Sequence, residues 1–167
     1  MSTVRITLSE PWTSSWAADD VRPDLSALSH GPGAHFHASL VIAVAGRNVP
    51  RLGFWGPNDV CVGTWIGVLA ELASALGGAD PSRYVFDEGE QGQPAFIFER
   101  EGPNVFVSVS RSELSGADGD GTWQRVKCSV DDLCQAIEAF LAEAHDHVVH
   151  AAPQGGPEWW VSVSGRA

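Results

Sequence analysis

The fold is decided by residues 105–148, which read VFVSVSRSELSGADGDGTWQRVKCSVDDLCQAIEAFLAEAHDHV and pass from a strand pattern to a helical one. Val105, Val107 and Val109 fall on one side of a strand, because side chains alternate with a period of two. From Val130 to about His147, apolar residues recur at spacings of three and four, as on one face of a helix. Ser129 with Asp132 is typical of a capped helix start. The apolar helix positions are Leu133, Ile137, Phe140, Leu141, Ala144 and Val148.

Earlier in the chain, apolar and polar residues alternate in several short segments, and turn residues separate these segments. Together they predict antiparallel strands joined by tight turns. A further helix is predicted after Thr64, which is its expected N-cap. It is expected to end at Gly77 and Gly78, which form a left-handed C-cap. The predicted strands are Val4–Leu8, Ala34–Ala45, Val49–Trp55, Tyr84–Asp87, Ala95–Arg100, Val105–Arg111 and Thr122–Cys128.

These elements predict an α+β fold, in which an antiparallel sheet of five to seven strands carries two main helices on one face. The 167 residues, 44% of them hydrophobic, suit one domain. We expect residues 1–33 to form a strand and an irregular loop, and residues 34–150 to form the α+β core. Residues 151–167 are expected to be a tail or an edge strand. Loops as long as residues 9–33 are more often functional or disordered than idle.

The charge of the chain limits its partners. Twenty-one acidic residues against ten basic ones give a net charge of −11. Such a field opposes binding to nucleic acid and to anionic membranes, and it favours encounter with a basic protein. Lys127 is the only lysine, and no Gly-Lys-Ser/Thr motif of a phosphate loop is present.

The cysteines and the apolar segments predict a cytoplasmic protein. Cys61, Cys128 and Cys134 form neither an even framework nor a CxxC pair, and the N-terminal residues lack the apolar run of a secretory signal. No segment approaches the roughly 18 apolar residues of a membrane-spanning helix.

His35 and His37 are candidate metal ligands, because they project from the same face of a predicted strand. A transition-metal site needs three or four convergent ligands. His145 and His147 lie about 200° apart on a helix and do not converge with each other. We therefore expect surface or packing histidines and no cofactor.

The segment Asp118–Gly121 is similar to the start of a calcium-binding loop. However, Trp123 stands where that loop needs glycine, and Ser129 stands where it needs a bidentate glutamate. We expect a solvated turn.

Two other groups admit a catalytic interpretation. Asp87, Glu88 and Glu90 offer paired carboxylates for acid-base chemistry, but their Gly-rich turn favours an exposed patch. Cys128 and Cys134 are candidate nucleophiles, although small buried cysteines are more common. No catalytic residue is assigned on these patterns.

Seven tryptophans are more than a core of this size needs. Trp65 and Trp123 fall in regular elements and are expected in the interior. Tryptophans in loops either cover the edge of the core or contact a partner, and clustered carboxylates engage cationic surfaces. The predicted partner-binding residues are Trp12, Trp16, Asp19, Asp20, Asp87, Glu88, Glu90, Asp118 and Asp120.

One pattern extends from about position 34 to 150. It comprises the early strands, the helix TWIGVLAEL at residues 64–72, the segments GQPAFIFER at 92–100 and VFVSV at 105–109, and the closing helix. This order resembles that of the small bacterial immunity proteins of polymorphic and contact-dependent toxin systems, including those beside WapI-type toxins. The resemblance implies a non-enzymatic cytoplasmic inhibitor that binds a cognate toxin domain. An acidic surface suits a basic partner of this kind.

Two other hypotheses stay open. An acidic secretion-chaperone-like or scaffold protein would use an exposed sheet or a homodimer interface. A metal-dependent enzyme would use His35 and His37 together with the acidic loop.

Overall fold

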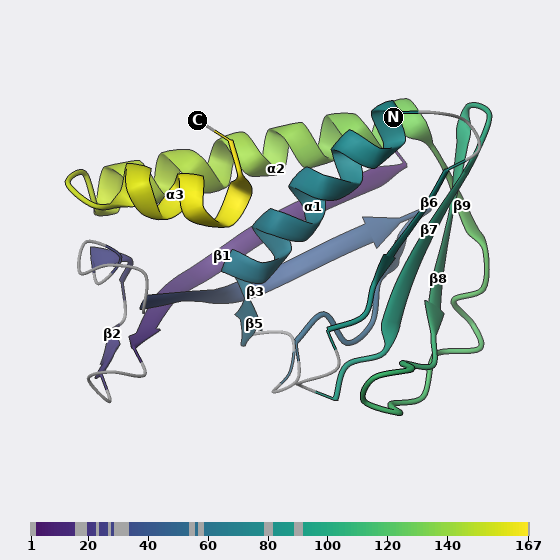
Figure 1. Ribbon diagram of the computed structural model, residues 1–167, viewed down its shortest axis with the longest axis horizontal. Helices are drawn as coiled ribbons and strands as arrows, with labels where there is room; N and C mark the ends of the chain where they lie inside the picture. Colours follow the sequence, from purple (N-terminus) through teal and green to yellow (C-terminus); the bar gives the residue numbers. More distant parts are fainter. Residues whose placement is uncertain are drawn as a thin grey trace.

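The computed structural model describes residues 3–15, 20–22, 24–26, 28, 34–53, 56, 59–78, 82–88 and 92–166. Within these residues, nine strands form two antiparallel sheets, and three helices pack against them (Figure 1). The predicted α+β class is confirmed. The prediction of one sheet of five to seven strands is wrong, because the strands divide into a five-stranded and a four-stranded sheet.

The first sheet, sheet A, is built around two long antiparallel strands. β1 (Val4–Ser15) pairs with β2 (Asp20–Arg22) on one side and with β3 (Ala34–Val44) on the other. β4 (Arg47–Asn48) and β5 (Val60–Cys61) pair with different parts of β3. Residues 9–15, which were predicted to be irregular, thus continue β1.

The second sheet, sheet B, is a meander of consecutive strands. Its order is β6 (Ser82–Phe86), β7 (Ala95–Glu101), β8 (Asn104–Ser110) and β9 (Val126–Ser129). The predicted strand at Thr122–Cys128 starts later, because residues 121–125 are turns and coil and Asp120 accepts the backbone N–H of Thr122.

The predicted strand at Val49–Trp55 is also wrong for the residues that the structure describes. In this segment only Arg47 and Asn48 form a strand with β3; the N–H of Val49 still donates to the carbonyl of Ile42, and residues 50–53 leave the sheet. Pro50 has no N–H to donate to a ladder, and Arg51 has a positive φ of 57°. Trp55 lies outside the described residues.

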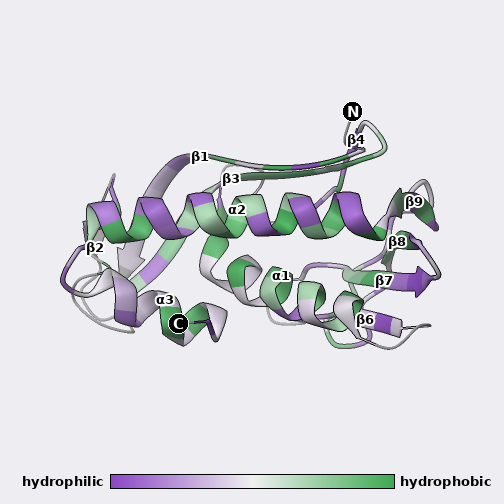
Figure 2. Ribbon diagram, turned by 90° about the horizontal axis from the view of Figure 1, so that it is seen from above, coloured by the Kyte–Doolittle hydropathy of each residue, from purple (hydrophilic) through white to green (hydrophobic). Residues whose placement is uncertain are grey.

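The helices α1 (Val62–Gly77), α2 (Val130–Ala151) and α3 (Gly156–Ser164) lie on one side of sheet A (Figure 1). Seen from above, α1 and α3 both lie alongside α2, on which hydrophilic segments recur (Figure 2). Among these helices, none is both long enough and apolar enough to cross a lipid bilayer.

The helix ends differ in how well the sequence predicts them. The cap of α2 is confirmed, because Ser129 accepts the N–H of Asp132 at 2.9 Å. α1 begins earlier than predicted, with Cys61 as N-cap. Its C-cap Gly78 has a φ of −84°, so the prediction of a left-handed cap is wrong.

The C-terminal segment forms the helix α3 instead of an edge strand or a tail. Pro157 stands in its first turn, where a missing N–H is harmless, and Gly165 ends it with a φ of 64°. Trp159 and Trp160 are only 5% and 6% exposed. Trp159 also donates from Nε1 to the carbonyl of Ala34 at 3.2 Å, so α3 is fixed to the start of β3.

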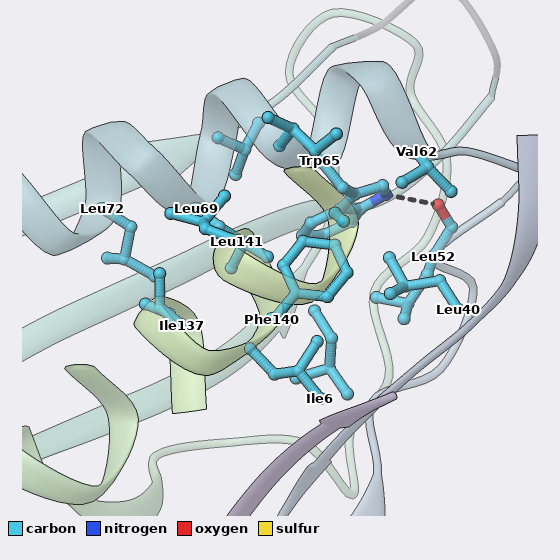
Figure 3. Packing of buried hydrophobic residues seen from close by; sticks show 14 of the residues in the cluster. Ile6, Leu40, Leu52, Val62, Trp65, Leu69, Leu72, Ile137, Phe140 and Leu141 are labelled. Carbon is cyan, nitrogen blue, oxygen red and sulfur yellow. Dashed lines mark hydrogen bonds between the residues drawn. The ribbon is translucent and has the colours of Figure 1, made fainter. Parts of the chain in front are cut away.

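One hydrophobic core joins the helices to both sheets (Figure 3). Trp65 of α1 packs edge-on against Phe86 and Phe96 of sheet B, with ring centroids 5.2 Å apart in each pair. Its indole N–H donates to the carbonyl of Leu52 at 2.9 Å, the dashed line in Figure 3. Trp65 and Trp123 are 2% and 3% exposed, which confirms their predicted interior positions.

Candidate functional site

A β-bulge in β1 determines which side chains reach the outer face of sheet A. Ser9 lies opposite Ser39 and Trp12 lies opposite His37, so two residues of β1, Glu10 and Pro11, occupy the space of one. Glu10 has a φ of 54°, the left-handed conformation of the first residue in one common bulge type. The extra residue reverses the alternation along the strand.

The consequence of the bulge is visible in the burial pattern. Before it, Val4 and Ile6 point into the core; after it, Thr13 is fully buried. Ser14 is therefore placed on the face away from the helices, where it is half-buried. If β1 alternated regularly with no bulge, Ser14 would share the inward face of Val4 and Ile6.

Ser14 meets His37 on this face, and His37 in turn meets Asp59. The hydroxyl of Ser14 lies 3.0 Å from Nε2 of His37, and Nδ1 of His37 lies 2.9 Å from Oδ1 of Asp59. Ser14 comes from β1, His37 from β3, and Asp59 directly precedes β5, which pairs with β3. Since a carboxylate only accepts hydrogen bonds, Nδ1 carries the proton and Nε2 accepts from Ser14.

Other side chains surround this serine-histidine-aspartate array. The ring of Trp12 stacks on His37, with centroids 4.2 Å apart and planes 14° from parallel. The ring of His35 is 6.3 Å away. Cys61 lies directly opposite His37 in the strand pairing, and its Sγ is 3.5 Å from Oγ1 of Thr64. The stack and the two hydrogen bonds hold the imidazole in one orientation.

Partial burial controls the protonation of His37. Burial lowers the pKa of His37 below 6.5, and this effect exceeds the opposing attraction of Asp59. The side chains of His37 and Asp59 are still 18% and 31% exposed, so solvent reaches the array. At neutral pH, His37 is therefore a neutral imidazole that can take up a proton at Nε2.

The geometry does not favour the metal hypothesis for His35 and His37. Both ring nitrogens of His37 are hydrogen-bonded, to Ser14 and to Asp59. Within the ranges that the structure describes, no group of three His, Cys, Asp or Glu side chains has the arrangement of a metal site. The proposal of a metal-dependent enzyme therefore gains no support.

The cysteine nucleophiles considered from the sequence are also disfavoured. Burial raises the pKa of the Cys128 thiol to about 11 and also raises the pKa of Cys134. Because the thiolate is the reactive form, both residues are poor nucleophiles at neutral pH.

The predicted partner-binding residues of the N-terminal region are only partly described. Trp12 stacks on His37 on the outer face of sheet A. The backbone of Asp20, in β2, pairs with that of Ser15 in β1. Trp16 and Asp19 lie outside the described residues.

The predicted acidic contacts farther along the chain have local partners. Asp87 accepts from the hydroxyl of Ser112 at 2.6 Å and from the N–H of Glu113 at 2.9 Å. Asp120 accepts both the N–H and the hydroxyl of Thr122. These carboxylates fix turns.

Two further members of the same set lie in different surroundings. Asp118 is 85% exposed and lies 3.2 Å from Arg111. Glu88 follows Asp87 beyond β6 and is half-buried. Glu90 lies outside the described residues. The members of the predicted set that the structure describes are thus spread over both sheets and do not form one patch.

A more uniform acidic surface lies on α2, outside the set of contact residues predicted from the sequence. Over 22 residues, this helix carries Asp131, Asp132, Glu138, Glu143 and Asp146 and no lysine or arginine. The side chains of Glu143 and Asp146 are 51% and 87% exposed. The signal was present in the sequence, because these residues fall between the apolar positions of the helix.

The acidic residues of α2 differ in their local contacts. Asp132 accepts from Thr3, and Glu138 pairs with Arg166 at 2.9 Å. Among the described residues, the ion-pair neighbours of Glu143 and Asp146 are histidines, His147 at 3.9 Å and His145 at 3.6 Å. A shallow depression at this end of α2 is lined by Glu143, Asp146, His147, Val149 and His150.

Comparison with known proteins identifies no relative. No family model, no curated protein and no solved structure matches the chain.

Proposed function

We propose that the protein binds a basic protein partner through the acidic solvent face of α2. One observation carries this proposal: the helix has five carboxylates and no basic side chain other than histidine over its whole length. At 1.5 Å per residue, the face extends for about 33 Å, which is long enough to contact a folded domain. Complementary charge of this kind speeds the encounter of partners and selects among them.

Local stability does not account for the charges at the C-terminal half of α2. The helix dipole favours carboxylates at the N-terminus, as for Asp131 and Asp132, and cations at the C-terminus. Glu143 and Asp146 gain nothing from the dipole at their positions. A surface contact with a partner is a physical reason for their presence.

The distribution of the basic side chains strengthens the acidic field. Many described arginines are engaged within the molecule. Arg47 lies over the ring of Trp123, Arg51 and Arg100 bind backbone carbonyls, and Arg125 bridges Glu99 and Glu101. Arg166 pairs with Glu138, so the acidic field is least compensated at Glu143 and Asp146, in the C-terminal half of α2.

We propose further that the partner is a toxin domain and that the protein is its immunity protein. The order of the elements supports this proposal, as does the acidic surface, since a nuclease-like toxin that binds nucleic acid would be basic. The gene next to the one for this chain is expected to encode a large secreted toxin with a variable C-terminal domain.

A matched pair of double variants tests the proposal. Glu143→Lys with Asp146→Lys reverses two charges on α2, whereas Glu113→Lys with Asp118→Lys makes the same change in net charge in the loop after β8, away from the C-terminal half of α2 (Figure 1). We expect the α2 variant to slow association with the neighbouring toxin domain by roughly tenfold or more at low salt. The loop variant should have a smaller effect.

Protection of cells provides the second measurement. Cells that express the toxin domain should survive with the wild-type chain and be protected less well by the α2 variant. A wild-type chain that neither binds the neighbouring domain nor protects cells would reject the immunity proposal. Equal loss of binding in both double variants would show that net charge matters and the face of α2 does not.

A further inference from the structure

We propose that Ser14, His37 and Asp59 form an acyl-transfer site, in which Ser14 is the nucleophile and a neutral carboxylic ester is the substrate. This activity goes beyond the proposed binding function, and it uses the face of sheet A away from the helices. It also departs from the expectation of a purely non-enzymatic protein.

The roles follow from the order of the hydrogen bonds. Nε2 of His37 accepts from the Ser14 hydroxyl at 3.0 Å, and Nδ1 donates to Asp59 at 2.9 Å. A serine hydroxyl is a weak nucleophile until an adjacent base removes its proton. His37 is that base, and Asp59 fixes the tautomer that leaves Nε2 free to accept.

The surroundings prepare the histidine for this role. Burial keeps the pKa of His37 below 6.5, so the imidazole is neutral and basic at neutral pH. The stacked ring of Trp12 holds the imidazole plane. Trp12 is therefore a positioning residue, and the strained bulge at Glu10 places Ser14 within reach of Nε2.

The reaction balances with water as the only co-reactant. Oγ of Ser14 bonds to the carbonyl carbon of the ester while its proton passes to Nε2 of His37. The carbon–oxygen bond to the alcohol then breaks, and the leaving oxygen takes that proton. Water, deprotonated by His37, attacks the acyl-serine, and the carboxylic acid departs as Ser14 regains its proton.

The substrate class follows from the charge near the array. Asp59 brings a carboxylate to within 2.9 Å of the imidazole, which repels an anionic substrate. The neighbouring side chains Trp12, Ser14 and His35 offer apolar and polar contacts. A neutral ester fits these surroundings best.

A fluorophosphonate probe tests the nucleophile directly on the full chain. The probe forms a phosphorus–oxygen bond with an activated serine and expels fluoride, and intact mass followed by peptide mapping locates the adduct. We expect one adduct, on Ser14, and none on Ser14→Ala. His37→Gln and Asp59→Asn should slow labelling by on the order of 10²-fold or more.

Two controls keep the result interpretable. Ser9→Ala alters a different serine of β1, which is exposed, and should leave labelling unchanged. Urea unfolding curves should show that each variant is folded. Labelling should also decline on acidification as His37 becomes protonated, a change that burial and His35 oppose and Asp59 favours.

Turnover completes the test with p-nitrophenyl acetate as the ester. The wild-type chain should hydrolyse it repeatedly, and Ser14→Ala should abolish the enzyme-dependent rate. Absence of an adduct on Ser14 in the folded wild-type chain overturns the proposal, as does labelling that is unaffected by His37→Gln. The Glu143→Lys, Asp146→Lys variant should label normally, so failure of this site and failure of the docking proposal are distinguishable.

Discussion

At the scale of single residues, Glu10 has the largest effect on what the outer face of sheet A presents. It is a non-glycine residue with a φ of 54°, a conformation that is unfavourable for side chains other than glycine, asparagine and aspartate. The bulge it forms brings Ser14 to His37 and sends Thr13 inward, where its hydroxyl donates to the carbonyl of Asp24 at 2.8 Å. Strained residues of this kind cluster at functional sites.

The pH dependence of stability tests the environment of His37. Because its pKa in the folded state lies below 6.5, the unfolded chain binds the proton more tightly, and stability is lost as the pH falls below 6.5. We therefore expect the difference in free energy of unfolding between the wild-type chain and His37→Gln to be larger at pH 7.5 than at pH 5.0. Urea unfolding at the two pH values measures it.

The opposite trend has a clear meaning. If acidification increased the stability of the wild-type chain relative to His37→Gln, attraction by Asp59 would outweigh burial, and the pKa would be raised. The comparison with the variant is needed because the many carboxylates of the chain also titrate below neutral pH.

The proximity of Ser14, His37 and Asp59 could not be predicted from the sequence. Ser14 and His37 are 23 residues apart, and His37 and Asp59 are 22 residues apart. Their meeting depends on strand register and on one extra residue in β1, neither of which leaves a local periodic signal. The sequence does place His35 and His37 on one face of a strand. It gives no sign that Ser14 and Asp59 lie beside His37.

At the scale of elements, α2 was predictable because its pattern is local. Leu133, Ile137 and Phe140 are all 1% exposed or less. Substitution Ile137→Ala should lower the free energy of unfolding by about 2–5 kcal/mol, since it removes a buried side chain and leaves a cavity. Gln135→Ala, at an exposed position of the same helix, should change it by no more than about 0.5 kcal/mol. Urea unfolding of the two variants measures the contrast, and similar effects would contradict the assignment of the buried face.

The helix α3 was not predictable by the same reasoning. Trp159, Val161 and Val163 alternate as in a strand, and the flanking glycines and prolines resemble a loop. Contacts with the start of β3 and with α2 decide the outcome: Trp159 packs 6.0 Å from Phe36, and Trp160 packs edge-on to His145. Tertiary packing here overrides the local pattern.

Trp159 supplies a test of this assignment. Trp159→Ala should lower the free energy of unfolding by about 3–5 kcal/mol, because it removes a buried indole and its hydrogen bond to Ala34. Val161→Ala, on the same helix but 47% exposed, should have little effect. Thermal or urea unfolding distinguishes them, and a stable Trp159→Ala chain would mean that the segment is a tail.

At the scale of the whole molecule, the division into two sheets could not be predicted from the sequence. Each strand has a local alternation, but the choice of partner depends on contacts between distant segments. α1 contacts both sheets. Its Trp65 packs against Phe86 and Phe96 of sheet B, and the helix also packs against β3 of sheet A. The helices leave the outer face of sheet A and the solvent face of α2 as two separate surfaces.

The two surfaces differ in charge and in chemistry. The face of α2 offers carboxylates to a cationic partner, whereas the Ser14 array offers a hydroxyl beside a neutral base. Binding at α2 leaves the other surface accessible. Substitutions can therefore abolish the proposed activity of one surface while the activity of the other is measured.

Docking through α2 is tested most directly by the affinity for the neighbouring toxin domain. Calorimetry should compare the wild-type chain with Glu143→Lys, Asp146→Lys at low and at physiological salt. The proposed function predicts tight binding by the wild-type chain, weakened by salt and strongly weakened by the double substitution. Equal affinity of the two chains at low salt, or no binding by either, would contradict it.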